Sequence, residues 1–266
     1  MIRNNRLQYS VVNSYNSCVE LTWDIIMYEN VVSEIAPTGT LRAGINLANI
    51  FLVTSKTANG DPDGVSPNIA KAIADKLGVN VTYVPCDTPG QTADVIRDQI
   101  CDIVLIADEP ARTEFIDFTD AYVEIEATYI VPMESTFRTV EDVDRTGVSI
   151  SVSGTSAYDL YLTRTLRNAE LHRAVGLPAA AKLFANENLD ALAGLRPALN
   201  ENLKDLPHCR ILNGRYMAVQ QAVGTKHGNL ATIEFLQDFI SQAKESGLIL
   251  DLLNRHDVNG KLQVAK

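Results

Sequence analysis

The sequence predicts a two-lobed α/β fold, and three observations support this prediction. Strand-like apolar runs alternate with helix-like runs along residues 41–107, an order typical of a parallel sheet with helical crossovers. A second series of the same kind begins at residue 148. The chain has 266 residues, of which 46% are hydrophobic, so it is long enough to bury one large core or two smaller ones.

The first series consists of three strands joined by two helices. The first helix has the clearest signals, because Ser66 is suited to the N-cap, Pro67 to the first helical position and Gly78 to the end. The apolar run that closes the series is typical of a strand buried on both faces. The predicted elements are the strand 41–46, the helix 67–77, the strand 79–85, the helix 92–99 and the strand 102–107.

The rest of the chain is predicted to contain the second series and a helical C-terminal part. A turn at residues 154–156 separates the first strand of this series from a helix that runs through Leu166. A late helix has apolar residues along one face and ends at Gly247. The other predicted elements are the strands 127–132, 148–153, 210–212 and 217–223, and a helix at 188–193.

These two series define the predicted domains. Turn residues at 37–40 introduce the first strand, so the residues before them are expected to be an appended segment. The segments near 130–136 and 211–217 are the expected hinges between the lobes. The predicted division is an N-terminal segment of residues 1–36, lobe one of residues 37–132 plus 217–266, and lobe two, inserted, of residues 133–216.

The charge of the chain excludes several classes of partner. The net charge is −10 and the pI is about 4.9, so there is no basic surface for nucleic acid or for anionic lipid. No apolar stretch near the N-terminus is long enough to cross a bilayer. Arg3 and Arg6 resemble the start of a secretory signal, but polar residues interrupt the stretch that follows, so a cytoplasmic location stays open.

No motif for a metal, a cofactor or a catalytic nucleophile is found. The four cysteines, Cys18, Cys86, Cys101 and Cys209, have neither C-x-x-C spacing nor zinc-ligand spacing with histidine. There is no Walker loop and no Ser/His/Asp motif. We therefore expect no metal, no cofactor and no catalytic residue.

Two segments resemble those of a known family. Residues 64–70, GVSPNIA, are similar to G-F-D-V-D-L-A, and residues 110–119 are similar to P-E-R-x-x-x-(V/I)-D-F-S. From Thr40 to about Asp257 the chain thus resembles the family 3 extracellular solute-binding proteins, two-lobed receptors of the periplasmic-binding-protein-like type II fold that serve amino-acid ABC importers. The resemblance implies a periplasmic monomer that closes on a small carboxylate-containing or amino-acid-like ligand and delivers it to an ABC transporter permease.

Arg112 is the main ligand-binding candidate. In the family this arginine holds the α-carboxylate of the ligand, and a guanidinium offers a bidentate fork that matches a carboxylate. The position directly follows the carboxyl end of a buried strand, where ligands bind in such sheets. The alternative is a surface arginine that pairs with Glu109 or Glu114.

The second lobe is expected to contribute Thr155 and Ser156. They lie where the family has a G-T/S turn that opens a helix, and a helix N-terminus offers N–H donors to an anion. The resemblance implies that these residues and Arg112 hold one carboxylate. The alternative is simple N-capping of the helix that contains Tyr158.

Three positions, Leu195, Glu126 and Ala107, depart from the family pattern. Leu195 stands where the family has the aspartate that binds the α-ammonium, so either another carboxylate supplies this charge or the ligand has no α-amino group. Glu126 is the candidate carboxylate, with a solvated strand-edge glutamate as the alternative. Arg196 either adds a second cation, which favours an acidic ligand, or is a surface charge. Ala107 replaces the family's threonine, so that only its backbone is available to the ligand.

The remaining candidates are polar residues around the expected cleft. Amide side chains after the first strand and on the returning strand are suited to binding a polar ligand tail, and a helical tyrosine is suited to stacking or hydrogen bonding. These candidates are Asn46, Asn49, Gln220, Gln221 and Tyr158.

Three classes of function follow. The first is a non-catalytic solute-binding protein. The second is an enzyme, because cyclohexadienyl dehydratase resembles this same fold, although no second-lobe carboxylate is placed by motif for that chemistry. The third is a ligand sensor inside the cell.

Overall fold

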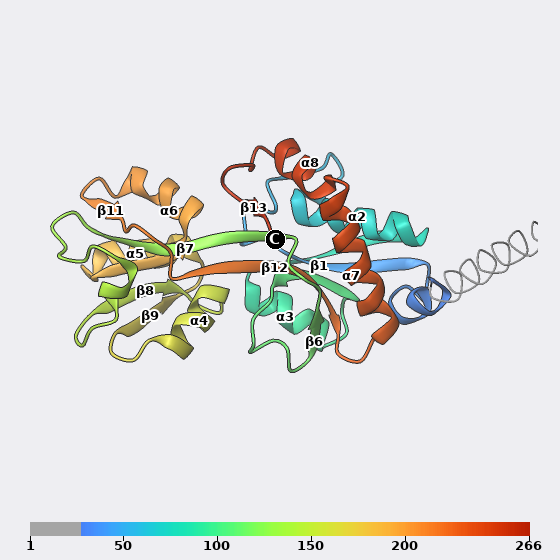
Figure 1. Cartoon of the computed structure of the whole chain (residues 1–266), viewed down its shortest axis with the longest axis horizontal. Helices are drawn as coiled ribbons and strands as arrows, with labels where there is room; N and C mark the ends of the chain where they lie inside the picture. Colours follow the sequence, from blue (N-terminus) through green and yellow to red (C-terminus); the bar gives the residue numbers. More distant parts are fainter. Residues whose placement is uncertain (1–27) are drawn as a thin grey trace, which may run out of the picture.

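The computed structural model of the protein describes residues 28–266. Figure 1 shows helices gathered in two groups along a pair of long strands, β7 (Val123–Pro132) and β12 (Met217–Lys226). We call the group that contains β1 lobe one and the group that contains β8 lobe two. The predicted two-lobed α/β arrangement is therefore confirmed. Within residues 28–266, no helix has the length and apolar character needed to span a membrane.

Lobe one is built on a parallel sheet. Strand β1 pairs in parallel with β4 on one side and with β5 on the other, and β12 then adds to β5 in the antiparallel direction. The short strand β6 pairs with β12, and β2 and β3 form a separate small ladder. The strands of this lobe are β1 (Thr40–Asn46), β2 (Ser55–Lys56), β3 (Pro62–Asp63), β4 (Asn80–Cys86), β5 (Ile103–Ala107), β6 (Ile116–Phe118) and β13 (Gln263–Val264).

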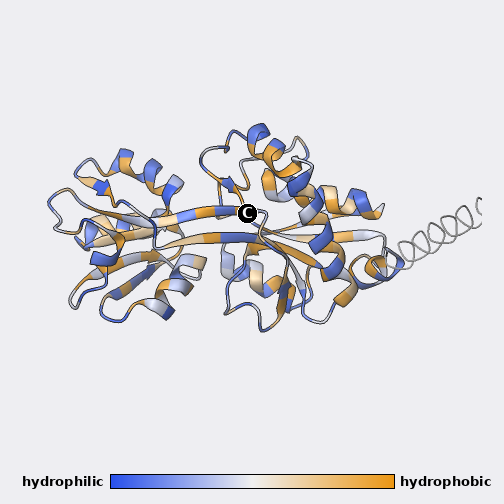
Figure 2. Ribbon diagram, viewed as in Figure 1, coloured by the Kyte–Doolittle hydropathy of each residue, from blue (hydrophilic) through white to orange (hydrophobic). Residues whose placement is uncertain are grey.

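Helices cover both faces of this sheet, as the fully buried β5 requires. Alternate residues of a strand point to opposite faces, and Ile103 and Leu105 join one apolar cluster while Val104 and Ile106 join another. Figure 2 shows the apolar residues running along these strands. The first cluster lies under α2 (Val65–Leu77), α7 (Leu230–Glu245) and α8 (Leu248–Arg255), and the second under α3 (Pro89–Arg97).

The described part of the predicted N-terminal segment belongs to the core of lobe one. Residues 28–35 are helical, and Val31 and Ile35 are fully buried in the large apolar cluster. The Glu34 carboxylate accepts hydrogen bonds from the backbone N–H of Thr232, at 2.9 Å, and from its hydroxyl, at 2.6 Å. The rest of the segment that the sequence sets apart, residues 1–27, lies outside the described residues.

Lobe two repeats the same design in a smaller form. Strand β8 pairs in parallel with β9 and β10, and β10 adds to β7 in the antiparallel direction. Helix α4 packs on one apolar cluster, and α5 and α6 pack on another. The elements are η1 (Val140–Val143), β8 (Ser149–Ser153), α4 (Ala157–Thr165), β9 (Glu170–Ala174), α5 (Leu177–Asn186), β10 (Ala191–Leu195), α6 (Arg196–Asn202), η2 (Leu203–Asp205) and β11 (Cys209–Ile211).

The helix predicted at residues 188–193 is wrong, because β10 occupies most of this segment. Ala191, Leu192 and Ala193 are fully buried between β7 and β8, so hydrogen bonds to these neighbours determine the strand. A short apolar run does not by itself distinguish a buried strand from a buried helix. Helix α5 and strand β9 were not predicted, and β7 begins four residues earlier than expected.

Strands β7 and β12 connect the two lobes by continuous pairing. Residues 123–127 of β7 pair with β12, and residues 127–130 pair with β10, so the hydrogen-bonded strand order runs without a break from lobe one to lobe two. The crossing is thus made of two long strands rather than of loops. The domain limits at residues 132 and 217 stay a prediction, since both strands take part in both lobes.

Candidate functional site

A cavity of about 380 Å³ lies between the lobes, at the carboxyl ends of their parallel strands. From lobe one it receives residues that follow β1, β4 and β5, and from lobe two it receives residues that follow β8, β9 and β10. Its volume is in the range of sites for small molecules. The strand ends of both sheets therefore converge on one space.

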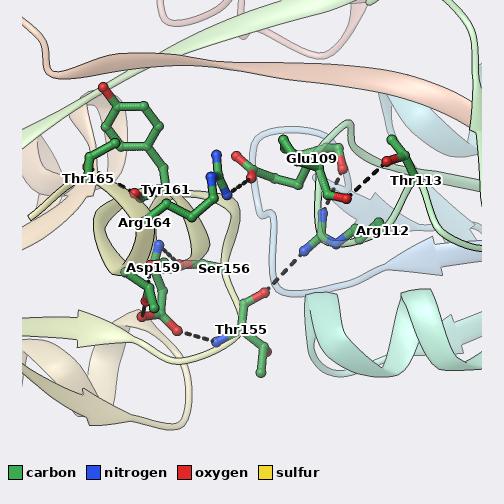
Figure 3. Close-up of polar contacts among 12 residues, drawn as sticks. Glu109, Arg112, Thr113, Thr155, Ser156, Asp159, Tyr161, Arg164 and Thr165 are labelled. Atoms are coloured by element: carbon green, nitrogen blue, oxygen red, sulfur yellow. Dashed lines mark hydrogen bonds and ion pairs between the residues drawn. The ribbon is translucent and has the colours of Figure 1, made fainter.

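Arg112 is the only basic residue among the described residues that line this cavity. It lies in the loop after β5, and only 3% of its surface is exposed. Its Nη1 donates to the carbonyl oxygen of Ala107 at 2.7 Å, and its Nη2 donates to the carbonyl oxygen of Thr155, in lobe two, at 3.1 Å. Figure 3 shows the guanidinium facing Thr155 across the space between the lobes.

The guanidinium of Arg112 is a buried charge whose bonds are to neutral groups. Burial lowers its pKa to about 10, although the nearby carboxylates of Glu109 and Asp108 act in the opposite direction. Arg112 is therefore still protonated at neutral pH. Within residues 28–266, no carboxylate lies close enough to form an ion pair with it. Such a cation is strongly stabilised by an anion that enters the cavity.

The turn between β8 and α4 faces Arg112 through a carbonyl group. The hydroxyl of Ser156 caps α4 by accepting from the N–H of Asp159 at 3.1 Å, and it donates to Ser153 at 2.7 Å. The N–H of Thr155 donates to the carboxylate of Asp159 at 2.9 Å. The structure thus brings Arg112 and the turn together, with these donors engaged inside the turn.

The backbone at Thr155 is strained. Its φ is +61°, in the left-handed region that a β-branched residue rarely adopts. The Thr155 side chain lies against Gly90 at the start of α3, where an added Cβ would come within 3.0 Å of its Oγ1. Contacts to both Arg112 and Gly90 hold the turn against lobe one in this arrangement.

A second polar contact between the lobes lies beside the cavity. Arg164 Nη1 in α4 and Glu109 Oε2 after β5 form an ion pair of 2.6 Å, and the Glu109 side chain is only 3% exposed. The guanidinium of Arg164 also lies over the ring of Tyr161, 5.8 Å from its centroid. Burial raises the pKa of Glu109, while the hydrogen bond and charge of Arg164 act to lower it. The alternative interpretation of the sequence paired Arg112 with Glu109 or Glu114. In the structure, Glu109 pairs with Arg164 instead (Figure 3).

Seven other predicted residues line the cavity. Two of them are almost fully buried amides, Asn49 at 7% and Gln221 at 4% exposed. The carboxamide oxygen of Asn49 accepts from the N–H of Phe51 at 3.3 Å, which shapes the loop after β1. The seven residues are Asn46, Asn49, Ala107, Ser156, Tyr158, Leu195 and Gln221.

Three predicted residues are not placed on the cavity wall. Thr155 reaches Arg112 only through its carbonyl group. Gln220 precedes the cavity residue Gln221 on β12, and its side chain donates to Glu124 at 3.4 Å on the other face, as strand alternation requires.

Glu126 forms an ion pair of 2.8 Å with Arg196 and approaches Arg215 at 3.5 Å. The carboxylate proposed to replace the missing aspartate is therefore occupied elsewhere.

The structure adds polar residues that sequence reasoning missed. Asp87, after β4, and Glu201 and Asn202, at the end of α6, line the cavity. The carboxamide oxygen Oδ1 of Asn202 is buried and has no hydrogen-bond partner in the described part of the chain. The helix predicted at residues 188–193 hid this signal, because only a strand there, followed by a helix, presents residues 198 and 201–202 on one face. Among residues 28–266, no group of acidic, histidine and cysteine side chains is arranged to hold a metal ion.

The family model for bacterial extracellular solute-binding proteins, family 3, matches residues 47–257. No curated protein matches the sequence.

Solved structures share the fold over most of their length. A mutant of ArgBP from T. maritima has a TM-score of 0.69 and 20% identity, covering 85% of this chain and 98% of that one. The cysteine-binding protein from Campylobacter jejuni has a TM-score of 0.69 and 19% identity, covering 85% and 92%. The ancestral amino acid-binding protein AncCDT-1, a precursor of cyclohexadienyl dehydratase, has a TM-score of 0.68 and 21% identity, covering 84% and 98%. At such identities the likeness establishes the fold.

Proposed function

Since the chain belongs to the family 3 bacterial extracellular solute-binding proteins and has their type II periplasmic-binding fold, we propose that it binds a small carboxylate-containing, amino-acid-like solute between its lobes. The buried cation Arg112 is the observation that most supports this proposal. It lines the cavity, it has no ion-pair partner in the described residues, and it already contacts both lobes. A carboxylate offers two oxygens to such a fork.

Closure of the lobes is part of the proposal. Arg112 and Glu109 of lobe one contact Thr155 and Arg164 of lobe two, so these contacts form only when the lobes approach each other. We expect a ligand carboxylate to take the place of the Thr155 carbonyl as acceptor for Arg112. We place the hinge in the paired strands β7 and β12, rather than in the segments near 130–136 and 211–217 that the sequence predicted.

Calorimetry of ligand binding tests the role of Arg112. We expect Arg112→Ala to cost about 2–5 kcal/mol of affinity, because it removes the only basic group that residues 28–266 contribute to the wall, and Arg112→Lys to recover part of it. The exposed Arg255 provides the matched control, since Arg255→Ala removes the same charge away from the cavity. Unchanged binding by Arg112→Ala would contradict the proposal.

The family supports a proposal for the partner and the location. We propose that the protein works outside the cytoplasm as a monomer and delivers its solute to an ABC transporter permease. The shared fold of ArgBP and of the cysteine-binding protein supports a binding role over the dehydratase alternative. Turnover of prephenate or arogenate by the wild-type protein would favour the enzyme instead, and recovery of the native protein in the cytoplasm would favour the sensor.

A further inference from the structure

One wall of the cavity is apolar at one end and polar at the other. Leu195, which ends β10, and then Ala198, Glu201 and Asn202 of α6 all line the cavity. Their spacing of three to four residues places them on one side of the helix. Because a helix rises 1.5 Å per residue, Glu201 lies about 9 Å along the axis from Leu195. The wall is thus apolar at its first part and carries hydrogen-bond acceptors at its far end.

One of the acceptors at the far end lacks a donor. Asn202 Oδ1 is buried without a partner in the described residues, and an unsatisfied buried acceptor is costly. The neighbouring Glu201 also lines the cavity, and one oxygen of its carboxylate pairs with Lys204, a surface contact of small energy. These two groups together are suited to a cationic N–H donor.

Beside Arg112, the described wall offers aliphatic side chains and the neutral amide of Gln221, which pairs with Ala107, but no carboxylate. Asp87 follows β4, which β1 separates from β5. Ala107, bonded to the guanidinium through its carbonyl, and Leu195 present aliphatic side chains to the cavity. Asp87 and Glu201 are the only acidic residues of the described wall, and both are exposed. Glu109 is near Arg112 but is paired with Arg164 and does not line the cavity. An ammonium on the carbon next to the bound carboxylate would therefore be poorly compensated.

We infer that the preferred ligand is an ω-amino or ω-guanidino carboxylate. Its carboxylate binds Arg112, its alkyl chain packs on Leu195 and Ala198, and its terminal cation donates to Asn202 and Glu201. The cavity of about 380 Å³ accommodates a molecule of this size. This inference rests on the proposed function, because it needs the carboxylate on Arg112.

Calorimetry with three matched ligands tests the inference. The probes are 5-aminopentanoate, which has both charges, pentanoate, which lacks the cation, and norvaline, which carries its ammonium on the α-carbon. We expect 5-aminopentanoate to bind at least about tenfold more tightly than either of the others, since each loses a charged contact.

Variants of α6 locate the cation site. We expect Asn202→Leu and Glu201→Gln each to reduce the affinity for 5-aminopentanoate by about tenfold and to leave that for pentanoate unchanged. The ratio of the two affinities within one variant does not depend on how much protein is folded. Glu187→Gln is the control, because Glu187 is an exposed glutamate of lobe two that does not line the cavity.

The outcomes separate this inference from the proposed function. If norvaline binds as tightly as 5-aminopentanoate, or if both α6 variants keep the wild-type ratio, the inference is overturned. If norvaline binds this tightly and Arg112→Ala abolishes its binding, the proposed function stands although the inference about α6 fails. If Arg112→Ala leaves the binding of all three ligands unchanged, both are overturned.

Discussion

Lobe one and lobe two hold their parts of the site in place by different interactions. In lobe one, the strands β1 and β5 that lead to the site are packed in a large apolar cluster together with α2, α7 and α8. Ile69 of α2 and Ile45 of β1 are fully buried in it. Apolar burial does not depend on the ionisation of any group. The loop with Arg112 is thus supported by a core that is insensitive to pH.

In lobe two, buried and half-buried carboxylates hold the backbone. Asp144 accepts from the N–H groups of residues 167–169 at 2.8–3.2 Å, and Asp190 accepts from the N–H of Ser149 at 2.8 Å. Asp159 accepts from the N–H of Thr155 and pairs with Arg173, each at 2.9 Å. The two walls of one cavity are therefore expected to respond to different perturbations, because an ionised acceptor, Asp159, holds the turn of lobe two that faces Arg112, whereas the strands that lead to Arg112 rest on apolar packing.

The largest expected effect concerns the core of lobe one. Ile69→Ala deletes a fully buried side chain, so we expect the free energy of unfolding to fall by about 2–5 kcal/mol. The loss is expected to be the same at neutral and at mildly acidic pH, as measured by chemical denaturation. Lys71→Ala on the exposed face of α2 is the control, with an expected change within about 0.5 kcal/mol. A loss in Ile69→Ala that varies strongly with pH would break the comparison.

The next effect concerns the turn of lobe two. Asp159→Ala removes the acceptor for Thr155 and the partner of Arg173, so we expect a loss of about 1–3 kcal/mol in unfolding free energy. Ligand affinity is expected to fall as well, because the turn that faces Arg112 loses its support. Calorimetry and thermal unfolding of the same sample measure both. Wild-type affinity in a destabilised Asp159→Ala protein would show that the turn does not shape the site.

A smaller effect is expected from the ion pair between the lobes. Arg164→Ala removes the partner of Glu109, and the lobes are free to separate and hydrate that carboxylate. We expect ligand affinity to fall by about 1 kcal/mol, with little change in the melting temperature of the ligand-free protein. Small-angle scattering is expected to show a larger radius of gyration than for the wild type. A scattering curve identical to the wild type would indicate that Arg164 does not favour closure.

The smallest effect concerns pH and Asp144. Burial alone raises the pKa of this carboxyl, but three backbone N–H groups and the charge of Arg167 together lower it below its ordinary value. Its contribution to stability is therefore present above the unfolded pKa of about 3.9 and is lost as pH falls through the lowered native pKa. We expect Asp144→Asn to be less stable than the wild type at neutral pH and to approach it in acid. A difference in melting temperature that stays constant down to pH 3 would contradict this.

Much of the fold was predictable because its signals are local. Pro67 and Gly78 indicated a helix within a few residues, and α2 occupies Val65–Leu77 with Gly78 as its C-cap. The predicted N-cap at Ser66 is wrong, because Gly64 is the N-cap and the Ser66 hydroxyl bonds that of Tyr122 instead. The apolar run before Arg112 predicted a strand buried on both faces, which β5 is. Placement of Arg112 at the cavity followed from its position after that strand. The ligand-binding roles of these residues stay predictions.

Local sequence patterns were enough to predict the alternation of strands and helices, the two series, and the place of Arg112 after a buried strand, because each depends on neighbours within a turn or a strand. The tertiary structure alone decided that residues 191–195 form a strand, since β7 and β8 supply their hydrogen bonds. It also decided that Glu126 pairs with Arg196, 70 positions away, and Glu109 with Arg164, 55 positions away. Charges of opposite sign are common along the chain, and only the packing of the lobes selects which of them meet.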